Sequence, residues 1–116
     1  MGKPDCLFCR IVDGAIPSDV VASTDRAMAF RDIAPKAPVH VLVIPREHVA
    51  SLGAADDGHE GLLGHLLRLA RDVARQEGVA ESGFRVVLNT GDDGGQTVHH
   101  LHAHVLGGRS LGWPPG

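Results

Sequence analysis

The stretch His99-His100-Leu101-His102-Ala103-His104-Val105-Leu106 carries half of the eight histidines in this chain of 116 residues. From position 100 onward histidine alternates with apolar residues, and Gly107-Gly108 follows. Strict alternation predicts a β-strand, because side chains two positions apart lie on the same face of a strand. We therefore expect a strand over 98–106 with histidines on one face and apolar residues on the core face: His100, His102 and His104 opposite Leu101, Ala103 and Val105.

A row of imidazoles on one strand face is suited to a phosphate group or a metal ion. Residues two apart along a strand lie about 6.5 to 7 Å from one another, so the row offers rings at fixed intervals. A face that only meets water would be served as well by Lys, Thr or Glu, and we therefore favour a chemical role for the row. His99 belongs to the opposite face, where we expect a surface position.

Composition predicts a single domain spanning residues 1–116 with one modest core. The formal net charge of -3 argues against nucleic acids and anionic membranes as partners. No run approaches the roughly 18 apolar residues of a membrane-spanning helix, and residues 1–5 lack the apolar stretch of a secretory signal. We therefore expect a cytoplasmic protein with no membrane partner.

The remaining chain predicts two helices and four more strands. The first helix covers Cys6–Val12 with Asp5 as its N-cap, and the second runs from a capping box of Asp57 and Glu60 to about Glu77. Strands are expected over 19–23, 27–31, 39–44 and 84–89. This order indicates an α+β fold with a mainly antiparallel five-stranded sheet, one long helix and one short helix. The long helix is predicted to bury Leu62, Leu63, Leu66, Leu67, Ala70, Val73 and Ala74.

A glycine-rich loop over 90–97 leads into the histidine stretch. Glycine lets backbone N–H groups approach an anion closely, which favours a nest for phosphate oxygens. Asn89 and Thr97 add side-chain donors, while Asp92 and Asp93 would repel a phosphate and are expected to face solvent. A neutral imidazole beside such a loop has a lone pair that can attack phosphorus and form a covalent phosphohistidine.

Cys6 and Cys9 are the two cysteines of the chain, spaced Cys-x-x-Cys. In a reducing compartment this spacing indicates metal or redox chemistry more than a structural disulfide. A thioredoxin-like role would need a βαβ context after an opening strand, and the predicted elements do not supply one. Both residues would also suit small buried positions in the first helix, so the pair alone leaves the choice open.

Several segments together resemble the histidine triad (HIT) superfamily. The run from His100 to Leu106 resembles its signature, and the resemblance extends over nearly the whole chain. Further segments resemble its ribose-binding segment, its central strand and the loop before the triad: Phe30–Pro35, His40–Pro45 and Gly94–Val98. Gly107-Gly108-Arg109 and the terminal Trp113-Pro114-Pro115-Gly116 are similar to the Hint branch in particular.

The resemblance implies a HIT-like fold and hydrolysis of the P–N bond in purine nucleoside 5′-phosphoramidates. His102 matches the nucleophile, which would form a nucleotidyl-histidine that water then hydrolyses to the nucleoside monophosphate. His104 matches the histidine that stabilises the phosphate, and the other catalytic positions are Thr97, Asn89 and His40. The residues expected to bind the nucleotide are Phe30, Asp32, Ile33, Asn89, Gly95, Gln96, Thr97, His102 and His104.

The resemblance also implies a structural zinc ion. Cys6, Cys9, His48 and His100 match the positions that hold zinc in bacterial members of the superfamily. Two cysteines and two histidines are a common tetrahedral set for structural zinc. Many members of the Hint branch lack zinc, so the metal stays open at this point, and no organic cofactor is expected.

Other functions remain compatible with these residues. One is a dinucleotide polyphosphate hydrolase of the same superfamily, another a nucleotide-binding module without catalysis, and a third a purely structural zinc module. Because Hint-type proteins are homodimers, we expect a homodimer with the tail over 109–116 at its interface. A frayed terminus is the alternative for this tail.

Overall fold

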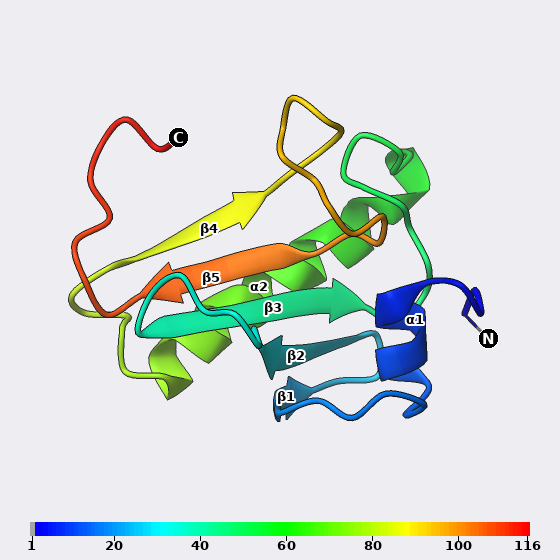
Figure 1. Ribbon diagram of the computed structural model, residues 1–116, viewed down its shortest axis with the longest axis horizontal. Coiled ribbons are helices and arrows are strands. Elements are labelled where there is room, and N and C mark those ends of the chain that lie inside the picture. Colours follow the sequence, from blue (N-terminus) through cyan, green and yellow to red (C-terminus); the bar gives the residue numbers. More distant parts are fainter. Residues whose placement is uncertain (1) are drawn as a thin grey trace.

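Five strands form one antiparallel sheet in the computed structural model, which describes residues 2–116. The strands lie in the order β1-β2-β3-β5-β4, with helix α2 behind one face and helix α1 over one end of the other (Figure 1). The predicted α+β fold is therefore confirmed. No helix within residues 2–116 is long and apolar enough to cross a membrane. The elements are α1 (Leu7–Val12), β1 (Val20–Ser23), β2 (Ala27–Arg31), β3 (Val39–Pro45), the 3-10 turn η1 (Asp57–His59), α2 (Glu60–Gln76), β4 (Phe84–Leu88) and β5 (Ala103–Gly107).

Each face of the sheet has its own apolar core. On one face, α2 packs against buried valines and alanines of β2, β3 and β5. On the other face, Phe8 and Ile11 of α1 pack against Phe30, Leu42 and other apolar residues of β2 and β3. Directly opposite residues of antiparallel strands share a face, and Leu42 is opposite His104. The face of β5 that carries His104 therefore lies on the α1 side of the sheet.

The buried stripe of α2 differs from the predicted one at Leu67 and Leu69, and Leu63 is only partly buried. Leu67 was expected in the core but is 51% exposed, whereas Leu69 is 6% exposed and belongs to the core. Leu62, Leu66 and Leu69 follow one another at spacings of four and three residues, so they define the buried stripe. Leu67 is turned about 100° from Leu66 around the helix axis and therefore reaches the surface.

Both predicted helix caps were wrong. Helix α1 is capped by Cys6 instead of Asp5, because Cys6 Sγ accepts a hydrogen bond from the Cys9 N–H at 3.3 Å. Asp56 caps the 3-10 turn η1, where its carboxylate accepts from the Gly58 N–H at 2.8 Å, and the N-cap of α2 itself is His59, which makes no side-chain cap bond. A 3-10 turn precedes α2 here, so the side-chain cap lies earlier than a capping box on Asp57 would require.

Strand β5 begins later than the alternating pattern predicts. Pairing with β3 and β4 runs over Ala103–Gly107, and residues 98–102 lie outside the ladder. The Leu101 N–H donates instead to the Val49 carbonyl at 2.7 Å, in the segment that leaves the sheet after β3. The three alternating histidines nevertheless stay on the α1 side, because Phe8 of α1 contacts the rings of both His100 and His102.

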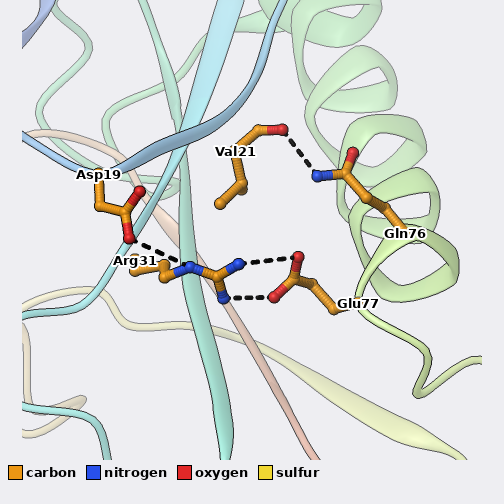
Figure 2. A network of polar contacts seen from close by, with 5 residues as sticks. All are labelled: Asp19, Val21, Arg31, Gln76 and Glu77. Carbon is orange, nitrogen blue, oxygen red and sulfur yellow. Dashed lines mark hydrogen bonds and ion pairs between the residues drawn. The ribbon is translucent and has the colours of Figure 1, made fainter.

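The C-terminal end of α2 is fastened to the β1 edge of the sheet by a polar network (Figure 2). Arg31 donates to the Glu77 carboxylate through its two terminal guanidinium nitrogens, and its Nε lies 3.2 Å from Asp19 Oδ2. Gln76 Nε2 donates to the Val21 carbonyl at 2.8 Å. The network fixes the end of β2, and the next residue after β2 is Asp32.

Candidate active site

His102 lies just before β5 with 6% of its surface exposed. Its Nδ1 is 2.7 Å from the backbone carbonyl oxygen of His100. A carbonyl can only accept, so Nδ1 carries the ring proton and Nε2 of the neutral imidazole keeps a free lone pair. The Phe8 ring meets the His102 ring at 5.2 Å in a T-shaped contact and limits its rotation. His102 thus keeps an unprotonated ring nitrogen in a fixed orientation.

His104 has the opposite tautomer, and a chain of hydrogen bonds sets it. The Lys36 backbone N–H donates to Nδ1 of His40 at 3.0 Å, so the proton of neutral His40 is on Nε2. This Nε2–H faces Nδ1 of His104 at 2.9 Å and donates to it. Neutral His104 therefore carries its own proton on Nε2. Its ring lies 4.9 Å from that of His102, so a donor and a lone pair are adjacent.

Burial keeps His40 and His104 neutral. It lowers the pKa of His104 to about 4, helped by the nearby charges that His102 and His40 would carry. It also lowers the pKa of His40, against the opposing effect of Asp32, whose Oδ2 lies 3.4 Å from His40 Nε2. Asp32, His40 and His104 have ligand atoms close enough for a metal. Their facing nitrogens already bond one another, however, which favours a hydrogen-bonded relay.

The expected nucleoside-binding residues surround the start of the loop after β2. Asp32 is half-buried, and its Oδ1 accepts from the Ala34 N–H at 2.8 Å while Oδ2 faces His40. Phe30 is 4% exposed and packs edge-on against Phe8, with ring centroids 5.5 Å apart. Ile33 is fully exposed and free to cover a ligand. One carboxylate and two apolar side chains therefore lie along one segment.

The glycine-rich loop is held by side-chain amides. Gln96 is buried, and its amide donates to the carbonyls of Ala50 and Val98 and accepts from the Gly91 N–H. The hydrogen-bonding groups of the Gln96 side chain are therefore occupied by backbone groups of the loop and its neighbours. Asn89 donates to the Gly94 carbonyl at 2.6 Å, and Gly95 adopts a φ of +79°, which favours glycine. Thr97 is exposed, so its hydroxyl is available, and Asp92 and Asp93 face solvent as expected.

A second cluster of side chains adjoins His102 on the α1 side. The ligand atoms of Cys6, Cys9, His48 and His100 all lie within 4.8 Å of one another. His100 Nδ1 is 3.3 Å from Cys6 Sγ and 3.4 Å from Cys9 Sγ, and His48 Nδ1 is 3.3 Å from Cys9 Sγ. Four residues from three distant segments of the chain thus converge on one point.

The donor set of this cluster fits a tetrahedral metal ion. Zinc bonds of about 2.3 Å to sulfur and 2.0 to 2.1 Å to nitrogen place these ligands about 3.6 Å apart, close to the separations found here. His100 is fully buried, and its Nε2–H donates to the Pro45 carbonyl at 2.9 Å. That bond leaves Nδ1 unprotonated and aimed at both thiols, as a ligand requires. With four protein ligands, the cluster offers no open position for a substrate.

Comparison with known proteins agrees with this geometry. A model of the HIT domain matches residues 13–111. The chain belongs to the HIT family. Among relatives of this HIT protein, adenylylsulfatase HINT1 of Arabidopsis thaliana is 49% identical over 112 residues, covering 95% of this chain and 76% of the plant protein. The expected Hint-type resemblance is thereby confirmed.

Two further relatives bear on the fold and on the metal cluster. A 14 kDa zinc-binding protein of Brassica juncea is 48% identical over 114 residues, which is 97% of this chain and 100% of that protein. The crystal structure of a HIT family hydrolase from Legionella pneumophila superposes with a TM-score of 0.94 at 46% identity. The superposition covers 97% of this HIT chain and 100% of the Legionella chain.

Sequence reasoning missed two contributors to the HIT site. Phe8 contacts the rings of both His100 and His102, and its position between the two cysteines was the available signal. The Lys36 peptide N–H sets the tautomer of His40, but a backbone group four residues away leaves no mark in residue identities. Both contributions depend on how the chain folds back on itself.

Proposed function

We propose that this chain is a hydrolase that cleaves the P–N bond of purine nucleoside 5′-phosphoramidates. The observation that carries the proposal is the pair of opposite tautomers at His102 and His104. One ring offers a lone pair and the adjacent ring offers an N–H. A nucleophilic displacement at phosphorus needs both, because charge develops on the phosphate oxygens as the nucleophile attacks.

The proposed reaction has two displacements at phosphorus. His102 Nε2 attacks the α-phosphorus, the P–N bond to the amine breaks, and the amine leaves with the bonding electrons and takes a proton from water. The His104 N–H stabilises the phosphate oxygens, assisted by the Thr97 hydroxyl and the loop held by Asn89. Water then attacks phosphorus and the bond to His102 breaks. The products are the nucleoside monophosphate and neutral His102.

The nucleoside half of the substrate would extend toward β2. Asp32 would accept hydrogen bonds from the ribose hydroxyls, and Phe30 and Ile33 would contact the base. The 49% identity to a plant protein named adenylylsulfatase supports a second candidate substrate. In adenylyl sulfate the same attack by His102 would break a P–O bond and release sulfate. The two candidates differ only in the leaving group.

Single-turnover mass spectrometry tests the proposal. The protein is mixed in excess with an adenosine phosphoramidate, quenched and digested, and the peptide containing His102 is examined for an added nucleotidyl mass. Parallel steady-state assays use the phosphoramidate, adenylyl sulfate and a diadenosine polyphosphate. We expect the adduct on His102 and the highest kcat/KM for the phosphoramidate. The mass-spectrometric experiment is repeated with any of the other two compounds that is turned over, and turnover without an adduct on His102 would contradict the nucleophile assignment.

We further propose that the cluster of Cys6, Cys9, His48 and His100 holds a structural zinc ion. The support is the tetrahedral spacing of its ligand atoms and the 48% identity to a protein named for zinc binding. Bound zinc would cross-link α1 to the segment before β5. Elemental analysis of protein purified without a histidine tag is expected to give about one equivalent, and less than about a tenth would contradict the proposal.

The chain is proposed to form a homodimer through the β4 edge and α2. An apolar hollow there is lined by Leu52, Leu63, Leu66, Leu67 and Leu88. Leu52, Leu67 and Phe84 are each more than a third exposed in the single chain. Apolar patches of this kind are typical of protein interfaces. The tail over 109–116 is proposed to lie at the same interface, since Trp113 is 83% exposed.

A further inference from the structure

His100 belongs to two constellations at once. Its imidazole is fully buried between the two thiols, with Nδ1 at 3.3 Å from Cys6 Sγ and 3.4 Å from Cys9 Sγ. Its backbone carbonyl is the acceptor that holds the Nδ1 proton of His102 at 2.7 Å. A movement of the His100 ring that carries its backbone along therefore changes the partner that sets the tautomer and orientation of His102.

Phe8 makes a second connection between the same two sites. It lies between Cys6 and Cys9 in sequence, and its ring contacts His100 at 5.9 Å and His102 at 5.2 Å. Helix α1 has only six residues, so it has little stability of its own and depends on its side-chain anchors. Anchoring the two cysteines therefore also fixes the aromatic ring that packs against His102.

The state of the cluster decides how firmly the His100 ring is held. The Nε2–H donates to the Pro45 carbonyl, which leaves Nδ1 free to bond a metal. Without a metal, Nδ1 keeps only a weak hydrogen bond from a protonated thiol 3.3 to 3.4 Å away. The ring then loses the stronger of its two anchors.

We propose that the cluster of Cys6, Cys9, His48 and His100 positions the nucleophile, with His100 as the coupling residue. Metal occupancy holds the His100 carbonyl and Phe8 where they keep His102 in its Nδ1–H tautomer. Loss of the metal lowers kcat and leaves nucleotide binding nearly unchanged, because the partners of Asp32 and His40 are one another, the 32–40 segment and His104, none of which belongs to the cluster. This inference rests on the proposed function for its kinetic part only.

Nitrogen NMR of the histidine side chains tests the coupling directly. Long-range ¹H–¹⁵N spectra distinguish Nδ1–H from Nε2–H tautomers, and His102→Asn assigns the His102 signals. Zinc-loaded protein is expected to show a single Nδ1–H tautomer at His102. Chelator-stripped protein is expected to show a broadened or mixed signal, a kcat lower by about tenfold or more and a KM changed less than about threefold. One equivalent of zinc should restore all three.

A ligand variant remote from His102 provides the second arm. His48→Ala removes one ligand whose nearest cluster partner is Cys9, and His65→Ala is the matched control. His65 is also half-buried and hydrogen-bonded, to the Thr24 hydroxyl at 2.8 Å, but it lies on α2. We expect His48→Ala to reproduce the stripped protein and to resist rescue by zinc. His65→Ala should retain the metal, the His102 tautomer and kcat.

The outcomes separate this inference from the proposals on which it builds. An unchanged His102 tautomer and kcat after zinc removal from folded protein would overturn the coupling, as would failure to bind zinc at all. If the loaded protein turns over no substrate, the proposed function fails, while the NMR comparison still decides the coupling. If His48→Ala does not fold by circular dichroism, stripping and reloading the unmodified chain gives the answer.

Discussion

At the scale of single residues, the site works through protons that the backbone places. The carbonyl of His100 fixes one tautomer, and the N–H of Lys36 fixes the other through His40. His102 and His104 are thereby made unlike, although both are histidines on the same side of the sheet. A row of identical side chains thus offers a free lone pair on one ring and an N–H donor on another, because each ring has a different fixed partner.

Replacement of His102, the proposed nucleophile, should abolish turnover without unfolding the chain. We expect His102→Ala to lower kcat by about a thousandfold or more, since loss of an attacking group removes the covalent route. The affinity for a nucleoside monophosphate should change little. Steady-state kinetics and calorimetric titration give the two measurements. His99→Ala, an exposed neighbour, is the control and should keep normal kcat; near-normal turnover by His102→Ala would refute the assignment.

Neutral His104 should make stability depend on pH. Its pKa is about 4 in the folded protein, whereas an unfolded histidine has a pKa near 6.5. Between these values the unfolded chain binds more protons, so stability is complete above about pH 7 and is lost as pH falls toward 4. After allowance for partial exposure, we expect a loss of about 1 kcal/mol between pH 7 and pH 5.

Urea unfolding at several pH values measures this loss. His104→Gln should reduce the pH dependence, because the variant lacks the imidazole whose pKa is about 4. His65→Gln, which also removes one histidine, should leave the slope as it is. Equal slopes for the two variants would show that His104 is not the source.

At the scale of elements, the sequence predicted those units whose pattern is local. Strand β2 occupies the predicted residues 27–31, and the strand predicted over 39–44 was confirmed with one added residue at Pro45. The start of β5 was not predictable, because it depends on a hydrogen bond from Leu101 to Val49, which is distant in sequence. The cap at Cys6 was missed for a related reason, since cysteine rarely serves as a cap.

Leu66 and Arg68 on α2 differ sharply in burial, and this predicts different costs of truncation. Leu66 is 1% exposed at the centre of the core beneath β3 and β5. Leu66→Ala should lower the free energy of unfolding by about 3 kcal/mol, as expected for a cavity in a packed core. Arg68→Ala, on the exposed side of the helix, is the control and should cost little. Urea unfolding at one fixed protein concentration compares them.

At the scale of the whole molecule, the exposed apolar surface next to β4 is the main feature that the single chain leaves without a partner. Leu67→Glu should convert the proposed dimer to a monomer, because it places a charge in the apolar hollow. Ile33→Glu makes the same chemical change at a fully exposed site elsewhere and should leave the assembly intact. Sedimentation velocity distinguishes the two species. A monomeric unmodified chain would refute the dimer.

The C-terminal tail should affect the choice of leaving group more than the fold. Its first part is fastened, since Arg109 donates to the Lys36 carbonyl at 2.9 Å and Arg85 donates to the Gly112 carbonyl. Trp113 beyond it is 83% exposed and available to contact a partner or a substrate.

Deletion of residues 111–116 should change the ratio of kcat/KM between a bulky and a small amine by about tenfold, while the thermal midpoint moves by only a few degrees. Trp113→Ala separates the contribution of the indole from that of tail length. Unchanged ratios in both variants would restrict the tail to a purely structural role.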